Sequence, residues 1–198
     1  MKKLRLLAKG TRKRYRHINS NSTGKERINI LDRQFSAVEK NKVWLTDITY
    51  INTAQGFLYL AVFLDVFSRK VVGWSMSKRM TENLVIDAFL QAYGRENPDE
   101  GLLVHSDQGS QYASKAFQMV LHQHDCVQSM SHKGTPYDNA PMESFYRTLK
   151  RELVDDEHYS NQLQAQQSIF KYIELYYNPK RAHSTLGYKS PIEYERSS

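Results

Sequence analysis

The chain has 198 residues, of which 40% are hydrophobic and 12% aromatic, a composition typical of a folded globular protein rather than a disordered one. Its single cysteine, Cys126, excludes an internal disulfide and fits a reducing compartment. No apolar run is long enough to cross a bilayer, and the basic start lacks the apolar stretch of a signal peptide. The sequence therefore predicts a cytoplasmic protein without a membrane partner.

The formal net charge of +7 is unevenly distributed along the chain. Residues 1–42 hold 13 Lys and Arg against 3 Asp and Glu, whereas residues 43–198 hold 15 against 18. We interpret residues 1–42 as a basic N-terminal arm and residues 43–198 as a globular body. A basic arm suits a polyanion such as nucleic acid, although some basic tails only aid solubility. The arm residues expected to bind DNA are Arg12, Lys13, Arg14 and Arg16.

The first part of the body reads as three strands. "VWLTDITYINT" (43–53) alternates between apolar and polar residues, as a half-buried strand does. "FLYLAVFLD" (57–65) is almost continuously apolar, which is typical of a central strand buried on both faces. "VVGWSMS" (71–77) completes an antiparallel meander.

The periodicity then changes to an alternation of helices and strands. Residues 81–96 predict a helix with Thr81 as its N-cap, and residues 114–124 predict a second helix. Short apolar strands are expected at residues 102–106 and 126–131.

Two further helices are expected towards the C-terminus. One begins near Asn139 and has Pro141 in its first turn; the other covers residues 163–178 and ends at Pro179. The element order predicts an α/β protein with a mixed five-stranded sheet and helices on both faces. This order resembles that of the ribonuclease H-like fold.

Three carboxylates occupy three of these elements. Asp47 lies within the first strand among apolar neighbours, where an unpaired carboxylate costs several kcal/mol. Asp107 follows the fourth strand, and Glu143 begins the helix that starts near Asn139. In the expected fold the first and fourth strands are neighbours and the helix lies across them. Clustered carboxylates repel one another unless divalent cations neutralise them, and oxygen ligands suit Mg²⁺ or Mn²⁺.

Other residues offer alternative interpretations. Asp65 and Asp138 are rival metal ligands, but Asp65 lies at a turn and Asp138 with Asn139 is typical of a helix cap. The H-x-H-x-C pattern of His122, His124 and Cys126 is compatible with zinc but lacks a fourth ligand.

A resemblance to a known family makes the interpretation more specific. Asp107 and Glu143 are separated by 35 residues, the spacing found in retroviral integrases and in many bacterial insertion-sequence transposases. The flanking motifs that resemble this family are "WLTDITYI", "DVFSRKVVGW", "HSDQGSQY", "KGTPYDNAPMESFYRTLKRE" and "YNPKRAHSTLGYKSPIEY". The resemblance as a whole extends from about residue 28 to residue 194.

The resemblance implies an integrase-type catalytic core of a DDE transposase. Asp47, Asp107 and Glu143 would be the catalytic residues and the ligands of two Mg²⁺ or Mn²⁺ ions. The implied reaction is hydrolysis of a phosphodiester at the element's end, after which the freed 3′-OH attacks a target strand. Phosphate contacts are expected from a set of body residues: Lys133, Arg147, Lys150, Arg181 and His183.

The resemblance also implies partners. Joining two DNA ends requires a homo-oligomer on DNA. Relatives carry a helix-turn-helix region ahead of the core, and residues 1–42 resemble only its end with a linker. We therefore expect a separate helix-turn-helix polypeptide of the same element as a possible partner. Two alternatives remain open: a hydrolytic metal-dependent nuclease on the same fold, and an inactive or regulatory DNA-binding remnant of an insertion element.

Overall fold

The computed structural model describes residues 28–198. The arm residues Arg12, Lys13, Arg14 and Arg16 lie outside the described residues, so their expected role stays a prediction. Among residues 28–198, the longest apolar helices fall short of what crossing a membrane requires.

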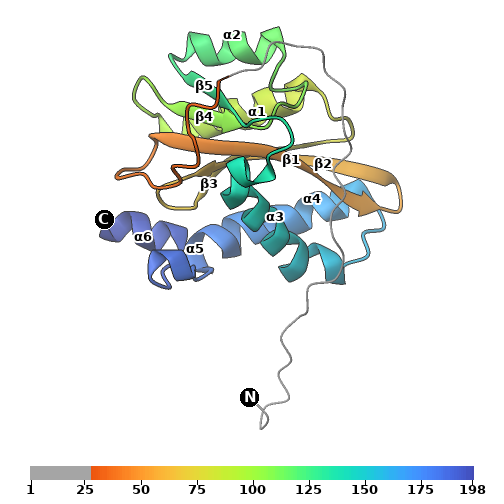
Figure 1. The fold of residues 1–198 in the computed structure, drawn as a ribbon. Coiled ribbons are helices and arrows are strands. Elements are labelled where there is room, and N and C mark those ends of the chain that lie inside the picture. The colour runs from red at the N-terminus through yellow and green to blue at the C-terminus, as the bar shows by residue number, and fades with distance from the viewer. Residues whose placement is uncertain (1–27) are drawn as a thin grey trace.

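A five-stranded mixed sheet forms the centre of the molecule (Figure 1). Its strands are β1 (Val43–Thr53), β2 (Gly56–Asp65), β3 (Val71–Ser77), β4 (Leu103–Ser106) and β5 (Val127–Met130). Strands β1, β2 and β3 form the antiparallel meander, whereas β4 pairs in parallel with both β1 and β5. The order β3-β2-β1-β4-β5 places β1 beside β4, which confirms the predicted sheet with small shifts at the strand ends.

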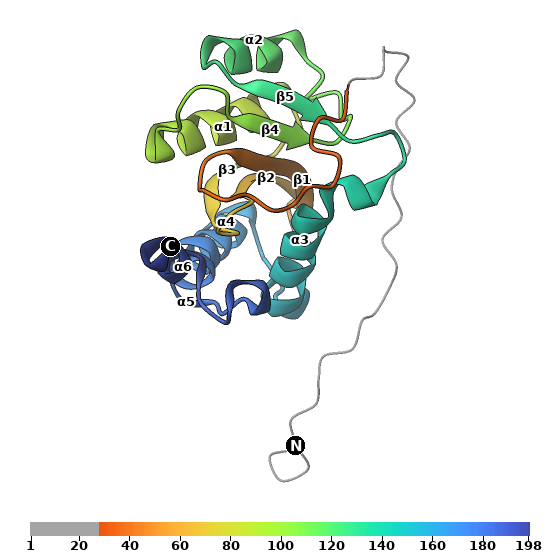
Figure 2. The ribbon, with the colours of Figure 1, turned by 60° about the vertical axis from the view of Figure 1, so that its left-hand side comes forward.

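Helices cover both faces of the sheet, as Figure 2 shows. One face carries α1 (Glu82–Glu96) and α2 (Lys115–Gln123), and the other carries α3 (Ala140–Glu152) and α4 (Gln162–Lys171). After α4 the chain continues through a π-helical turn, η4 (Tyr172–Tyr177), into α5 (Asn178–Lys180) and then α6 (Pro191–Ser197). Within residues 28–198 the chain also forms three 3₁₀ turns: η2 (Pro136–Asn139), η3 (Val154–Asp156) and η5 (Ser184–Leu186).

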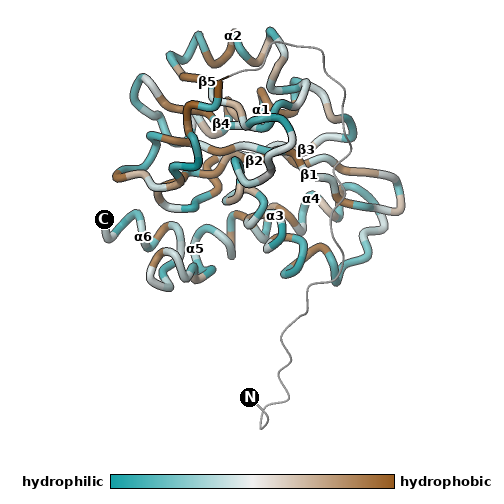
Figure 3. The backbone as a smooth tube through the Cα atoms, viewed as in Figure 1, coloured by the Kyte–Doolittle hydropathy of each residue, from teal (hydrophilic) through white to brown (hydrophobic). Residues whose placement is uncertain are grey.

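The alternation of side chains along β1 and β2 produces two hydrophobic cores, one on each face. Trp44 and Phe63 point to the face of α1, where they pack against Phe89. Leu45 points to the opposite face and belongs to the core that includes Met142 of α3. Because successive strand residues point to opposite faces, both sides of these strands are apolar. The tube coloured by hydropathy shows this concentration of hydrophobic residues in the sheet (Figure 3).

The C-terminal part differs from the sequence prediction in two ways. The prediction that Pro179 ends the long helix is wrong, because the helical path continues through Pro179 to Lys180. Proline normally clashes with the carbonyl four residues earlier, and the wider π-helical turn at Tyr172–Tyr177 precedes it here. The second difference is α6, which the prediction missed although Ser190 and Glu193 form a capping box around Pro191.

Candidate active site

Asp47 lies near the middle of β1 on the face that α3 covers. The alternation of β1 places it on the same side as Leu45, which is buried in the core beneath α3. Its side chain is half-buried, and Oδ1 accepts a hydrogen bond of 2.7 Å from the Ile48 backbone amide. The strand therefore fixes one carboxylate at the interface between sheet and helix.

Asp107 reaches the same region through the parallel pairing of β1 with β4. The register places Leu45 beside His105, and continuing it by two residues brings Asp107 alongside Asp47. Asp107 is exposed, and its Oδ1 accepts a hydrogen bond of 2.9 Å from the Gly109 backbone amide. A Cβ atom at Gly109 would lie 2.9 Å from this oxygen, so glycine leaves the room that the carboxylate occupies.

Glu143 is exposed in the first turn of α3. Two neighbours on its helix, four residues before and three after, hold the backbone of β1. The Asn139 side-chain amide donates a hydrogen bond of 3.1 Å to the Thr46 carbonyl oxygen. The Tyr146 hydroxyl donates a hydrogen bond to the carbonyl oxygen of Asp47. These two hydrogen bonds set the register of α3 on β1 and so determine where Glu143 lies.

The electrostatics of Asp47 show that the carboxylates act on one another. Burial raises the pKa of Asp47 well above its usual range, and the negative charge of Asp107 raises it further. The Ile48 amide opposes this rise, Glu143 adds to it and Lys150 opposes it. A cation beside Asp47 would relieve this repulsion, and the oxygen-only donor set of Asp47, Asp107 and Glu143 fits Mg²⁺ or Mn²⁺.

The carboxylates nevertheless do not form a closed ligand shell. Within residues 28–198 no group of three or more His, Cys, Asp or Glu side chains is gathered closely enough to hold a metal ion.

The H-x-H-x-C pattern forms local contacts instead: His124 Nδ1 is hydrogen-bonded to the Val120 carbonyl, and Cys126 Sγ donates a hydrogen bond to the His124 carbonyl.

The rival ligands Asp65 and Asp138 both have internal roles. Asp65 is buried and accepts hydrogen bonds from the Asn41 and Ser68 backbone amides, at 2.7 and 2.9 Å, so it stabilises the turn after β2. Asp138 is also buried and forms an ion pair of 2.7 Å with Arg33. Asn139 is the N-cap residue of α3, which agrees with the expected cap position, but its side chain makes no cap hydrogen bond and binds the Thr46 carbonyl instead.

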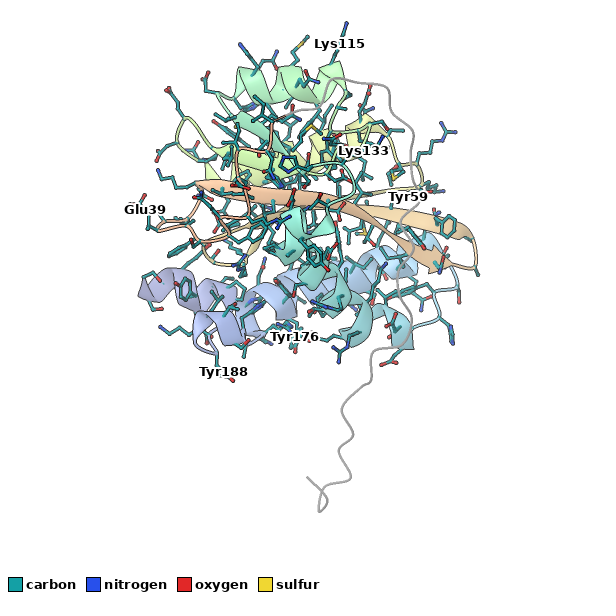
Figure 4. The ribbon with its side chains drawn as sticks, in the orientation of Figure 1. Glu39, Tyr59, Lys115, Lys133, Tyr176 and Tyr188 are labelled. Carbon is teal, nitrogen blue, oxygen red and sulfur yellow. The ribbon has the colours of Figure 1, made fainter. Side chains whose placement is uncertain are left out.

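The predicted phosphate-binding residues fall into two groups. Lys133 and Arg147 are exposed, and Lys133 lies on the loop between β5 and α3 (Figure 4). Lys150 is half-buried, with Nζ 5.1 Å from the centre of the Tyr50 ring, and its charge reaches Asp47. These three cations therefore belong to α3 or to the loop that precedes it.

Arg181 and His183 form the second group. Arg181 binds both carboxylate oxygens of Glu152 at 2.8–3.0 Å, and its guanidinium carbon lies 5.9 Å from the Tyr177 ring centre. Burial and the positive charge of Arg181 lower the pKa of His183 to about 4, so it is neutral at physiological pH. Both side chains thus have partners within the protein, at the far end of α3 from Glu143.

Residues near Asp107 support the loop rather than extend the site. Tyr112 is buried, and its hydroxyl lies 3.0 Å from Thr46 Oγ1, so it points into the protein. The Gln111 side-chain amide donates to the Met80 carbonyl at 3.1 Å. His105 is buried between Ser129 and Ser131, with nitrogen–oxygen distances of 2.9 and 3.0 Å.

Sequence reasoning missed the residues that hold the three carboxylate-bearing elements together. Asn139, Tyr146 and Arg33 are the main examples. Met142, Tyr146 and Leu149 recur at helical spacing, which is typical of a buried face, but nothing in that spacing indicates which carbonyl the Tyr146 hydroxyl meets. In the sequence Arg33 is one of the basic residues of the arm, and its partner Asp138 is 105 residues away, so the sequence does not indicate their ion pair.

Comparison with known proteins agrees with this architecture. A family model described as "Integrase core domain" matches residues 37–136, and a second model of the same description matches residues 124–191. The fold is also that of solved retroviral integrases. The simian T-cell lymphotropic virus intasome matches with a TM-score of 0.68 at 19% identity, covering 90% of this chain and 62% of that chain. The HTLV-2 integrase catalytic core domain, in complex with magnesium, matches with a TM-score of 0.58 at 20% identity, covering 80% of this chain and 98% of that chain.

The fold and these matches define the class: an integrase-type catalytic core, which is a polynucleotidyl transferase. The chain is 58% identical over 191 residues to the transposase for insertion sequence element IS904 of Lactococcus lactis subsp. lactis (strain IL1403), covering 96% of this chain and 76% of that protein. It is 44% identical over 167 residues to transposase InsF for insertion sequence IS3A of Escherichia coli (strain K12), covering 84% of this chain and 58% of InsF. The chain belongs to the insertion-sequence transposases that have an integrase core domain.

Proposed function

We propose that this chain cleaves and joins DNA strands in transposition and that Asp47, Asp107 and Glu143 are its catalytic residues. The observation that carries this proposal is geometric: the pairing of β1 with β4 brings Asp107 alongside Asp47, and the hydrogen bonds of Asn139 and Tyr146 hold the start of α3, with Glu143, against β1. Burial raises the pKa of Asp47, and the charges of Asp107 and Glu143 raise it further. A polar cluster that destabilises its own charges is common at functional sites and requires a compensating cation.

The three carboxylates would hold two Mg²⁺ or Mn²⁺ ions. When bound, such ions neutralise the charge that develops on the attacking and leaving oxygens of a phosphodiester. Asp47 is fixed by its strand and by the Ile48 amide, and Asp107 is held by the Gly109 amide, whereas Glu143 is exposed in the first turn of α3. We infer that the ligand shell closes when Glu143 turns towards Asp47.

The protein groups around the carboxylates position the DNA. A water oxygen attacks the phosphorus at the element's end, and the bond to the 3′-oxygen breaks with transfer of a proton to that oxygen. The resulting 3′-OH then attacks a phosphorus of the target strand. A new bond forms between this 3′-oxygen and the phosphorus, the bond from the phosphorus to the target's own 3′-oxygen breaks, and that oxygen leaves as a hydroxyl with the proton released by the attacking group. Lys133, Arg147 and Lys150 follow the loop and α3 beside this position, and we assign them to the phosphates on either side of the cut.

The experiment that tests the proposal is nicking and strand joining of supercoiled plasmid DNA in Mn²⁺, with the native chain and Glu143→Gln. We expect nicked and joined products from the native chain and neither from the variant. Nicking without joining would instead favour a hydrolytic nuclease. Equal activity of the two proteins would overturn the assignment of Glu143, and inactivity of both would favour the DNA-binding remnant.

The oligomeric state and the protein partner extend this proposal. Joining two ends to one target requires two active sites, so we propose a homo-oligomer on DNA. A separate helix-turn-helix polypeptide of the same element would supply recognition of the element's ends. Size-exclusion chromatography with light scattering, with and without duplex DNA, measures the first point directly.

A further inference from the structure

Asp138, five residues before Glu143, is bound on three sides. Its Oδ1 accepts a hydrogen bond of 2.7 Å from Arg33 Nε. Its Oδ2 accepts from the Asn29 side-chain amide at 3.1 Å and from the His132 backbone amide at 3.0 Å, and the His132 ring nitrogen Nδ1 also lies at 3.0 Å. The carboxylate is 1% exposed, so these contacts replace its hydration.

The segment that supplies Arg33 and Asn29 is itself anchored to the edge of the sheet. Ser129 of β5 accepts hydrogen bonds from the backbone amides of Ile30 and Leu31, at 2.9 and 3.2 Å. The Met130 amide donates to the Ile28 carbonyl at 3.2 Å, and the Leu31 side chain is buried in the core. Arg33 therefore extends from a fixed support.

Within the segment of residues 28–33, two residues other than glycine adopt a left-handed backbone conformation. Asp32 and Arg33 have φ values of 41° and 60°, in the left-handed region. Residues other than glycine are held there only when surrounding contacts fix them. The Asn29 side chain accepts a hydrogen bond of 3.0 Å from the Asp32 amide, so Asn29 binds both Asp138 and the turn that presents Arg33.

On its other side, Asp138 leads directly into the glutamate helix. Asn139 binds the Thr46 carbonyl, one residue before Asp47, and α3 begins at the next residue. The loop that precedes Asp138 includes Gly134 with φ +75°, and its internal backbone-to-backbone hydrogen bonds are single turn contacts at Thr135 and Asp138. The Arg33–Asp138 pair is thus a link between a sheet-anchored segment and the first turn of α3.

We propose that Arg33 and Asp138 are positioning residues for Glu143. Their ion pair fixes the loop of residues 132–139, and the loop fixes the start of α3, so that Glu143 faces Asp47 and Asp107. This inference rests on the proposed catalytic function of Glu143, but its structural part does not require it. Arg33 acts through Asp138 and does not contact the reacting groups.

The experiment uses the full chain and compares Arg33→Ala, Arg33→Lys, Asp138→Asn and the double variant Arg33→Ala/Asp138→Asn. The matched control is Lys115→Ala, which removes an exposed cation from α2, on the opposite face of the sheet from α3; Figure 4 labels both Lys115 and Lys133 of the loop. Three quantities are measured: the rate of Mn²⁺-dependent nicking, the affinity for a 30-base-pair duplex, and amide hydrogen exchange in peptides covering residues 137–147.

We expect Arg33→Ala to lower the nicking rate at least tenfold and to raise exchange at the start of α3 several-fold, with DNA affinity changed less than twofold. Arg33→Lys retains a cation within reach of Asp138 and should recover most of the rate. The double variant should be no worse than the poorer single variant, because both changes break one link. Lys115→Ala should match the native chain.

Two results would overturn the inference. Exchange at residues 137–147 that is unchanged in Arg33→Ala would show that the pair does not hold the loop. A fall in DNA affinity equal to the fall in rate would make Arg33 a DNA contact, which its 55% exposed side chain permits. If Glu143→Gln is as active as the native chain, the proposed function fails instead, and the exchange measurement still decides whether the link exists.

Discussion

The Tyr146 hydroxyl donates a hydrogen bond to the backbone carbonyl oxygen of Asp47, which joins the centre of α3 to the carboxylate-bearing residue of β1. Tyr146 is 6% exposed, and burial raises the pKa of its hydroxyl well above the usual range, followed by the charge of Asp47. The hydroxyl is therefore a permanent donor. Glu143 lies one turn earlier on the same helix, so this hydrogen bond relates two of the three carboxylates.

Tyr146→Phe removes this hydrogen bond and the longer contact of 3.4 Å between the same hydroxyl and the Leu60 carbonyl oxygen, and it leaves the ring in place. We expect the free energy of unfolding in urea to fall by about 1 kcal/mol, the usual net value of one internal hydrogen bond. The nicking rate should fall more than this stability loss explains, because α3 loses its register on β1. Tyr159→Phe is the matched control, since the Tyr159 hydroxyl bonds to Ser168 Oγ at 3.2 Å away from the carboxylates. Equal rates for the two variants would contradict this role of Tyr146.

Gly109→Ala tests the space around Asp107. The added Cβ would lie 2.9 Å from Asp107 Oδ1, so the exposed carboxylate must move away and give up its hydrogen bond from the Gly109 amide, a small cost to folding at the surface. We expect nearly unchanged thermal stability and a nicking rate about tenfold or more below that of the native chain, because the group that we propose as catalytic is displaced. Gly94→Ala is the control: its Cβ meets nothing within 4 Å in α1, and it should add about 0.5–1 kcal/mol of stability with full activity.

The two groups of predicted phosphate-binding residues should behave differently towards salt. Alanine at Lys133, Arg147 or Lys150 should weaken duplex binding and reduce the slope of log K against log salt by about 1 for each phosphate that the variant no longer binds. Arg181→Ala should leave the slope unchanged and lower stability by about 1 kcal/mol, because the partly exposed Glu152 loses its bidentate partner. A reduced slope of log K against log salt for Arg181→Ala would show instead that Arg181 binds DNA.

His105 predicts a dependence of stability on pH. Burial lowers the pKa of His105 to about 4, whereas the unfolded chain titrates near 6.5, so the unfolded state binds the proton more tightly between these values. Titration of His105 should therefore leave the free energy of unfolding unaffected above pH 6.5. As the pH falls from 6.5 to about 4, it should lower that free energy by an amount on the order of 3 kcal/mol. The difference in urea stability between pH 7 and pH 5 should shrink in His105→Asn but not in His122→Asn, which replaces an exposed histidine. An unchanged difference in His105→Asn would assign the pH dependence to other groups, with His183 as the next to replace.

Most of the fold follows from the local pattern of apolar and polar residues along the sequence. The alternation in residues 43–53 and the continuous apolar run in residues 57–65 each report which faces of a strand are buried, and both strands form where expected. The C-terminal helix was harder to predict because π-helical hydrogen bonding at Tyr172–Tyr177 leaves no separate sequence period, so Pro179 looked like an end.

The candidate site was predictable to the extent that it depends on element order. A parallel pairing of the first and fourth strands brings Asp47 and Asp107 together, and that pairing follows from the order of strands and helices. Which cations are available to DNA was less predictable. Lys133 and Arg181 are both basic residues in polar segments of the sequence, but Arg181 forms an ion pair with Glu152 in the folded protein.

The sequence by itself determined the class of this protein, the order of its strands and the three carboxylates, because these depend on residue type and on spacing along the chain. The tertiary structure alone decided which polar groups hold those carboxylates in place. Asn139 with Thr46, Tyr146 with Asp47 and Arg33 with Asp138 each join residues about a hundred positions apart. A hydrogen bond requires two atoms within about 3 Å, and for residues so distant in sequence only the packed fold brings them that close.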